Sequence, residues 1–467
     1  MSEPLLADAP QEPPRPAFAA EVDEELVANV EALIASGQEG MVMNLTADLH
    51  PADLARLLAH LDPDEARALF GWLPNEAAGA VLPELETARR SDLLDELAAH
   101  TLVGLIDEID TDDAADVLGD LPDELAARVL PKLEDAAEVR HLMGYDEDTA
   151  GGLMDARYVS VPDTSTVDEA TEIVRGCAEE VDPVYVVYVV DEAGRFLGTV
   201  SLMRLLLARG ATPVRELLQA DAVSVTPEVD QEEVARIMER YDLAALPVLT
   251  PDGRLLGRIT IDDVVDVIRE EAEEDLQRAS GITGEEEVSS SVFQISKGRI
   301  VWLLLGLVGA FASGLVIKGF EGSLERATVL AVFIPVVMAM AGNAGIQSSA
   351  ISVQGLVSGD IWGSDLLRRL GKEVLVALLN GVVLALVLAV GVLLIGLGAA
   401  HPGALAVTVG LSLFLVVILA TVIGAAVPIL LARVKIDPAL AMGPFIMVTN
   451  DILGLTVYFL VATVFYL

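Results

Sequence analysis

The 467-residue sequence has few of the residues that build disulfides, histidine metal centres or nucleophilic catalytic sites. Its single cysteine, Cys177, excludes a disulfide within the chain and is typical of a reducing compartment. Its histidines are scattered, with no metal-ligand spacing, so we expect no histidine-based metal site and no enzyme. The five are His50, His60, His100, His141 and His401. No basic, apolar secretory signal is recognisable at the N-terminus.

Basic residues are also scarce, and the charge is unevenly distributed. The formal net charge is -43, although 53% of the residues are hydrophobic. Residues 1–295 hold 65 acidic and 20 basic side chains, whereas residues 296–467 hold seven and nine. The sequence therefore predicts an acidic soluble half joined to an apolar, nearly neutral half.

The apolar half contains several stretches with almost no charge. A transmembrane helix needs about 20 apolar residues. Stretches that meet this requirement cover residues 300–317, 327–359, 374–400, 402–432 and 439–467. We therefore expect five spanning helices in a transmembrane domain over residues 298–467, embedded in a lipid bilayer.

Lysine and arginine in the short loops predict the orientation of these spans. If the N-terminal half is cytoplasmic, the inner flanks hold seven basic residues and the outer flanks hold Lys318 and Arg326. We expect a multi-pass protein of the cell inner membrane, with a cytoplasmic N-terminus and the C-terminus outside.

Asp451 is the one ionisable residue inside these five stretches. A charge at that depth costs at least ~2.5 kcal/mol, so its side chain faces water or the protein interior, where it either meets a cation or pairs with a packing partner. Asp437 precedes it by fourteen residues, which on one continuous helix is about 21 Å along the same face. Two acids on one face predict a cation path, with Asp437 at the cytoplasmic mouth and Asp451 near mid-membrane.

The second and fifth spans carry further candidate pore residues. Asn343 lies between Gly342 and Gly345, and these glycines predict a break that exposes backbone carbonyls to a water-filled lumen. Hydrogen bonding between helices is the alternative role for the polar residues here. Pro444, within the fifth span, either lines the pore entrance or only kinks the helix.

Two different patterns divide the acidic half. Residues 41–155 repeat short segments in which a proline precedes acids in a first helical turn, as at Pro51, Pro63 and Pro122, and predict a superhelical stack. Residues 156–275 contain two copies of a strand–turn–strand–helix pattern. The Pro- and Ala-rich start, within residues 1–40, is predicted to be a disordered tail.

The two copies resemble a tandem of cystathionine-β-synthase (CBS) domains, over residues 156–213 and 214–275. In the second copy, the run GRITIDD at 257–263 matches the strand and T-x-x-D element with which some members bind adenosine nucleotides. This resemblance implies possible ATP binding through Thr260 and Asp263. The first copy has Arg204 in place of the acid.

The segment after this element is strongly acidic. Its acids are spaced by one, three or four residues, which on a helix gathers them on one face, where like charges repel unless cations lie against them. A simple solvated face is the alternative. The acids are Asp263, Asp266, Glu270, Glu271, Glu274 and Asp275. We expect a connecting helix over residues 276–297 to lead from here into the first span.

The whole layout resembles the MgtE family of magnesium channels. The resemblance is carried by YDEDTAGGLM at 145–154, GNAGIQS at 342–348, DPAL at 437–440 and NDILGL at 450–455. It implies a multidomain membrane protein: an all-α superhelical N domain, α/β tandem CBS domains, a connecting plug helix and five transmembrane helices. It also implies a homodimer, with the second and fifth spans lining a pore on the twofold axis, and no nucleic-acid partner.

The resemblance further implies which acids hold Mg²⁺. Asp451 is implied to hold the ion at the selectivity site, and Asp437 to mark the mouth. The implied sensor ligands are Asp112, Asp116, Asp230, Glu232, Asp242, Asp263, Asp266, Glu271, Glu274 and Asp275.

We therefore expect a channel that takes up Mg²⁺ and is gated by cytoplasmic Mg²⁺ bound to its acidic domains. A proton-coupled divalent cation transporter with CBS regulation is the alternative. An aspartyl intramembrane protease needs a second acid at depth, and an anion transporter needs a basic site, so the sequence disfavours both.

Overall fold

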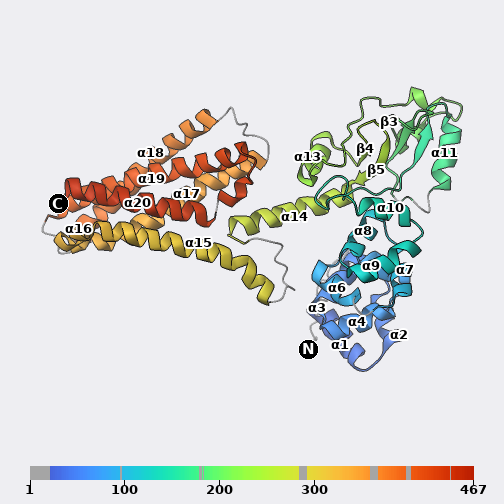
Figure 1. The fold of residues 1–467 in the computed structure, drawn as a ribbon, viewed down its shortest axis with the longest axis horizontal. Coiled ribbons are helices and arrows are strands. Elements are labelled where there is room, and N and C mark those ends of the chain that lie inside the picture. Colours follow the sequence, from blue (N-terminus) through green and yellow to red (C-terminus); the bar gives the residue numbers. More distant parts are fainter. Residues whose placement is uncertain are drawn as a thin grey trace, which may run out of the picture. The chain divides into compact units, whose positions relative to one another are not determined.

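The computed structural model describes residues 22–94, 97–177, 181, 183–282, 292–357, 366–395, 401–441 and 443–467. Contacts divide the chain into two compact units, residues 1–269 and 270–467. Each unit is described by itself, with the element labels of Figure 1.

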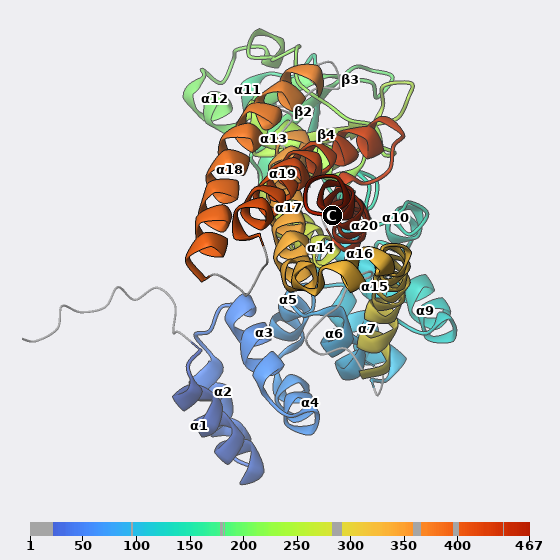
Figure 2. The same cartoon turned by 90° about the vertical axis from the view of Figure 1, so that its left-hand side faces the viewer.

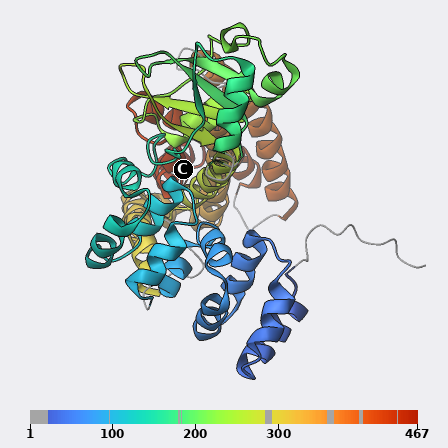
Figure 3. The ribbon, with the colours of Figure 1, turned by 90° about the vertical axis from the view of Figure 1, so that its right-hand side faces the viewer.

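The first unit begins with a stack of short helices, shown in blue and cyan in Figures 1 and 3. Apolar residues, mostly leucine, alanine and valine, bury one side of these helices in a shared core that includes Leu57, Leu69, Leu102 and Leu118. The α-helices are α1 (Glu24–Ala35), α2 (Glu39–Thr46), α3 (Pro51–His60), α4 (Pro63–Trp72), α5 (Asn75–Val81), α6 (Thr87–Leu94), α7 (Ala99–Ile106), α8 (Thr111–Gly119), α9 (Asp123–Val129) and α10 (Ala136–Leu142), with a 3₁₀ turn η1 (Leu130–Lys132).

Prolines and acids begin several of these helices, as the sequence predicts. Pro51 and Pro63 stand in the first turns of α3 and α4, where a missing N–H leaves no broken hydrogen bond. Pro122 is one residue earlier relative to its helix, at the N-cap of α9.

The prediction of a disordered tail over residues 1–40 is wrong for its second half. Residues 1–21 lie outside the described part, but α1 occupies Glu24–Ala35 and α2 begins at Glu39. Asp23 caps α1 by accepting a hydrogen bond from the Leu26 N–H (2.8 Å), and Val30 is fully buried. The local cap and one apolar stripe outweigh the polar composition of the segment.

The CBS region follows in the same unit, with its strands in green in Figure 3. Strand β2 (Val186–Val190) pairs in parallel with β1 (Ser160–Pro162) and antiparallel with β3 (Phe196–Ser201), and β4 (Ala245–Leu249) pairs antiparallel with β5 (Leu255–Thr260). The intervening helices are α11 (Val167–Gly176), α12 (Leu202–Leu207), η2 (Val214–Glu216) and α13 (Gln231–Tyr241). Helix α14 (Ile261–Ala279) follows β5, and its residues from 270 on belong to the second unit. The predicted strand–turn–strand–helix repeat is present in both copies.

Helix α14 ends earlier than the predicted connecting helix. Its last residue is Ala279, and Gly281 follows with a φ of +77°, a conformation that glycine adopts without strain. The Ile282 N–H donates to the Gln277 carbonyl (2.9 Å), which closes the helix end. Of the predicted helix over 276–297, residues 276–279 end α14, residues 283–291 lie outside the described part, and residues from 292 begin the first span.

Among its described residues, the second unit contains five helices that are long and apolar enough to cross a membrane. In the described residues they are α15 (Val292–Gly319), α17 (Ile334–Val357), α18 (Leu366–Ile395), α19 (Pro402–Arg433) and α20 (Pro444–Phe465), with α16 (Glu321–Arg326), η3 (Thr328–Phe333) and η5 (Pro438–Ala441) between them. Figure 2 shows α17, α19 and α20 side by side, with α18 beside α19.

Small residues let these helices approach closely. A Cβ atom on Gly424 of α19 would lie 2.3 Å from the Gly345 carbonyl oxygen of α17, so only glycine fits there. The expected helix break at Gly342 and Gly345 is therefore wrong, because α17 runs unbroken through both residues. The backbone N–H and C=O groups of α17 bond within the helix, and Gly345 serves the packing between helices.

Asp437 and Asp451 do not share one helix, so the expected continuous acidic stripe is also wrong. Asp437 precedes η5, and α20 begins only at Pro444, after Gly443. Two prolines lack the N–H groups that a continuous helix over this segment would need. Because Pro444 is the first residue of α20, it starts the helix rather than kinking it.

Candidate functional site

In the first unit, acids of the helical stack face acids of α14. Asp112, in the first turn of α8, is 8% exposed, and its Oδ1 has no hydrogen-bond partner in the described part of the chain. Burial raises the pKa of Asp112 well above its usual range, and the neighbouring charges of Asp113, Asp263 and Asp155 raise it further.

Asp113 and Asp263 belong to the same group. Burial, with the charges of Asp263 and Asp116, raises the pKa of Asp113 to about 7. Burial also raises the pKa of Asp263 to about 6, against the lowering effect of a hydrogen bond from the Thr260 hydroxyl (2.8 Å). Carboxylates that repel in this way are stabilised by a cation or by a proton.

Glu84, after α5, extends the group. Burial and the nearby charge of Asp266 raise the pKa of the Glu84 carboxyl. We call the five carboxylates the acidic face, which consists of Glu84, Asp112, Asp113, Asp263 and Asp266. Three were predicted ligands, whereas Glu84 and Asp113 were missed because nothing local in the sequence places them opposite α14.

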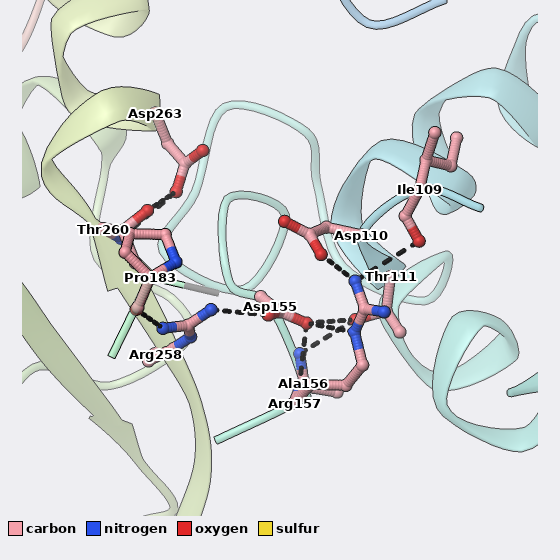
Figure 4. A network of polar contacts seen from close by, with 10 residues as sticks. All are labelled: Ile109, Asp110, Thr111, Asp155, Ala156, Arg157, Pro183, Arg258, Thr260 and Asp263. Atoms are coloured by element: carbon pink, nitrogen blue, oxygen red, sulfur yellow. Dashed lines mark hydrogen bonds and ion pairs between the residues drawn. The ribbon is translucent and has the colours of Figure 1, made fainter. Parts of the chain in front are cut away.

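Asp155 holds the elements around the acidic face (Figure 4). Its carboxylate accepts a hydrogen bond from the Thr111 hydroxyl (2.9 Å) and pairs with the buried Arg258 (3.3 Å) and with Arg157 (3.4 Å). Arg258 also donates to the Pro183 carbonyl (2.6 Å). Asp155, 3% exposed, thus joins the start of α8 to strand β5, and sequence reasoning missed it because its partners are distant in the chain.

Three predicted sensor residues lie at the ends of α13, apart from this group. Asp230 caps α13 by accepting from the Glu232 N–H (3.0 Å), Glu232 pairs with Arg236 (3.0 Å), and Asp242 ends the same helix with a φ of 51°. Asp116 is exposed on α8, one turn after Asp113, and its charge raises the pKa of Asp113. Eleven residues of helix separate the two ends of α13 by about 16 Å, so its acids do not form one site.

Across the described residues, no three acidic, histidine or cysteine side chains converge closely enough to hold a metal ion. Mg²⁺ does not require such a cage, because it keeps several of its waters and binds proteins through one or two carboxylates. The unpartnered Oδ1 of the buried Asp112 is a hard oxygen donor of the kind this ion prefers. The acidic face therefore suits an ion that keeps most of its water ligands, such as Mg²⁺, better than an ion that must be surrounded entirely by protein ligands.

In the second unit, Asp437 lies beside the end of α14. Its carboxylate accepts hydrogen bonds from Arg278 (2.7 Å) and from the Ala439 N–H (2.8 Å). Arg278 also pairs with Glu274, one turn earlier. A Cβ on Gly443 would lie 3.2 Å from the Ala279 carbonyl, so this end of α14 packs against the start of α20. Glu271 and Asp275, also predicted ligands, lie on the same part of α14 and are half-buried.

Asp451 lies on α20, two turns from its start, and is half-buried. The preceding residue, Asn450, is 2% exposed and donates to the Ala341 carbonyl of α17 (3.3 Å). Asn343 and Gln347 are exposed on α17, four residues apart and so on one face. The structure thus brings the second and fifth spans together at these motifs.

Asp451 is not the only ionisable residue within a spanning helix. Helix α18 begins at Leu366, eight residues before the predicted span, and so includes Arg369 and Glu373. Glu373 is 7% exposed and accepts a hydrogen bond from the Ser348 hydroxyl (2.7 Å). The sequence placed Glu373 outside the span because of its charge. Its ion pair with Arg369 (2.6 Å) offsets part of the cost of burying the carboxylate on the helix.

Comparison with protein families matches three models to this chain. Residues 334–461 match MgtE, described as a divalent cation transporter, and residues 49–148 match the MgtE intracellular N domain. Residues 150–210 and 214–270 match the CBS domain.

Curated relatives match over most of the chain. The magnesium transporter MgtE of Thermus thermophilus is 34% identical over 460 residues, which cover 94% of this chain and 98% of that protein. The magnesium transporter MgtE of Bacillus subtilis is 36% identical over 70% of this chain and 72% of that protein.

Among solved structures, the cytosolic domain of the Mg²⁺ channel MgtE in complex with ATP is 35% identical, with a TM-score of 0.49, and covers 52% of this chain and 99% of that one. The soluble part of a magnesium transporter is 29% identical, with a TM-score of 0.48, over 53% of this chain and 99% of that one.

Proposed function

The chain belongs to the MgtE family of magnesium transporters, and from that premise we propose that it is a Mg²⁺ channel gated by cytoplasmic Mg²⁺. The observation that carries the proposal is the half-buried Asp451, on a spanning helix whose neighbour Asn450 binds the backbone of α17. An acid at membrane depth persists where it meets water or a cation.

The exposed polar face of α17 supports a homodimeric pore. Asn343 and Gln347 would face lipid in an isolated protomer, which leaves two side-chain amides without partners in an apolar medium. A second copy against α17 and α20 would enclose these amides and bring two Asp451 carboxylates together. Such a pair would hold a largely hydrated Mg²⁺ through its waters.

The membrane potential supplies the driving force for uptake in this proposal. An inside-negative potential is worth ~2.3 kcal/mol per charge per 100 mV, or about 4.6 kcal/mol for a divalent cation. Import then needs no ATP hydrolysis and no coupled proton. The orientation with the acidic half in the cytoplasm remains part of the proposal.

The acidic face is the proposed sensor. At low Mg²⁺ its carboxylates repel one another, and the helical stack separates from α14. At high Mg²⁺ the ion lies between Asp112 or Asp113 and Asp263, removes the repulsion and holds α14 in place. The remaining predicted ligands on α13 and α14 are proposed to bind Mg²⁺ against the second protomer.

The contact between Arg278 and Asp437 is proposed to be one of the closing contacts of the gate. It ties the end of α14 to the residue at the expected mouth (2.7 Å). When α14 moves away, the Asp437 carboxylate becomes available to an entering cation.

ATP binding at the CBS pair is a further, separate proposal. Thr260 and Asp263 lie at the end of β5 and the start of α14, where the sequence predicts them to contact a nucleotide. The hollow nearby, lined by Tyr185, Tyr188 and Arg258 among others, is too narrow to admit a nucleotide as it stands. A nucleotide would therefore have to displace these side chains.

Magnesium flux into liposomes that carry the purified protein tests the channel. The wild type should conduct Mg²⁺ along an imposed potential, whereas Asp451→Ala should lose nearly all flux and still insert. Asp252→Ala, which removes an exposed loop acid, is the matched control. Normal flux through Asp451→Ala would refute the selectivity assignment.

A pH gradient separates the channel from a proton-coupled transporter. For a channel, the reversal potential follows the Mg²⁺ gradient alone. A reversal potential that shifts with the pH gradient would favour coupling to protons.

A further inference from the structure

The buried carboxylate of Glu373 has no role in the function proposed above. It lies in the second turn of α18, where Arg368 and Lys372 are exposed while Glu373 is 7% exposed. One carboxylate oxygen accepts from the Ser348 hydroxyl of α17 (2.7 Å), and the other pairs with Arg369 (2.6 Å). Both oxygens are therefore engaged, and the acceptor of the contact to α17 is a charged group, which strengthens the hydrogen bond.

Ser348 belongs to the most polar part of α17. Ser349 and Ser352 are fully buried, and their hydroxyls have no hydrogen-bond partner within the described residues. Among the three serines, Ser348 is the one that reaches a charged group. Its bond to Glu373 is therefore a specific tie between α17 and α18.

The same stretch of α17 is held from a second side. Asn450 of α20 binds the Ala341 carbonyl, and Gly424 of α19 packs against Gly345. Ser348 lies two turns after Ala341, so polar contacts from two different helices hold both ends of this stretch. Between them lie Asn343 and Gln347, whose exposed face is turned by about 100–140° from Ser348.

We propose that Glu373 is a positioning residue for conduction, which sets the rotation of α17 through Ser348 and thereby aims Asn343 and Gln347 at the pore. The inference rests on the proposed channel function. Arg369 balances the Glu373 charge, so that the carboxylate remains an acceptor in an apolar setting.

Two serine substitutions of identical chemistry test the proposal. Ser348→Ala removes the donor to Glu373, whereas Ser352→Ala removes a hydroxyl on the same face, one turn away, that has no such partner. Flux per inserted protein should fall about tenfold for Ser348→Ala and stay within about twofold of the wild type for Ser352→Ala. Equal flux in the two variants would overturn the proposal.

A second arm separates positioning from general stability. Gln347→Cys, in a background with Cys177→Ser, should react with a water-soluble thiol reagent, and Ser348→Ala should slow that reaction about tenfold with little change in melting temperature. Glu373→Leu combined with Ser348→Ala should reduce flux no further than Glu373→Leu alone, since that variant already leaves the Ser348 hydroxyl without its acceptor. Additive losses, or an unchanged labelling rate, would contradict the assignment.

The wild type distinguishes this inference from the function on which it rests. If wild-type liposomes conduct no Mg²⁺, the channel proposal fails. If the wild type conducts and Ser348→Ala conducts equally, only the role of Glu373 fails.

Discussion

Asp112 shows how one buried carboxylate can make a folded state depend on cations. Burial raises its pKa, and the charges of the nearby Asp113 and Asp263 raise it further. An acid with a raised folded-state pKa binds its proton more tightly when folded, so the protein is stabilised at low pH. That stability is lost as pH rises from about 4, the unfolded value, to about 6 and 7, the folded pKa values of Asp263 and Asp113.

We therefore predict that the melting temperature of the full-length protein in detergent falls between pH 5 and pH 8 when divalent ions are removed. The corresponding loss in the free energy of unfolding should be on the order of 1–2 kcal/mol. Millimolar Mg²⁺ should restore the loss at pH 8 and have less effect at pH 5, where protons already neutralise the acids. Calorimetry or near-ultraviolet circular dichroism would measure it.

Asp112→Asn should remove much of this dependence, because it keeps the shape of the side chain and removes its charge. Asp123→Asn is the control, since Asp123 is an exposed acid in the first turn of α9. Equal pH profiles for the two variants would show that the buried acid is not responsible.

Arg278 is the residue on which the proposed closing contact with Asp437 depends. At Mg²⁺ concentrations that are expected to close the channel, Arg278→Gln should raise Mg²⁺ flux by about two- to fivefold. This factor corresponds to the free energy of a partly exposed ion pair. Arg175→Gln, which breaks an exposed pair with Glu172, is the control. Lower flux through Arg278→Gln would contradict a closing role.

At the scale of elements, the close approach of α17 and α19 decides how the second span is placed. The two helices meet at Gly345 and Gly424, where no side chain fits. The glycines of GNAGIQS therefore serve close packing between helices and do not break α17. In a membrane such packing holds helices together, because the hydrophobic effect does not favour association of helices in lipid.

Gly424→Ala should destabilise the membrane unit by about 1–3 kcal/mol, because the new methyl must push the two backbones apart. Gly403→Ala on the same helix meets open space and should be neutral or slightly stabilising. Thermal unfolding of both variants in the same detergent would compare them. A stable Gly424→Ala protein would show that the helices separate at little cost.

At the scale of the molecule, the separation of charge from apolar surface is the dominant property. The net negative charge of the acidic half opposes its compact state by self-repulsion, whereas the membrane half is nearly neutral. We predict that residues 1–295 of the full-length protein resist protease in millimolar Mg²⁺ and are cleaved without it. Sodium chloride at equal ionic strength controls for screening. Cleavage that is indifferent to Mg²⁺ would rule out the gating proposal.

The sequence by itself determined the two-part organisation, the five spans, the repeated strand units and the family, because apolar run length, period and local motifs act over a few residues. Only the tertiary structure decided that Asp437 and Asp451 lie on different elements, that α17 is unbroken and that Glu373 is buried against Ser348. It also placed Asp112 beside Asp263. Such pairings depend on how helices far apart in the chain pack against one another, and a local sequence pattern does not predict that packing.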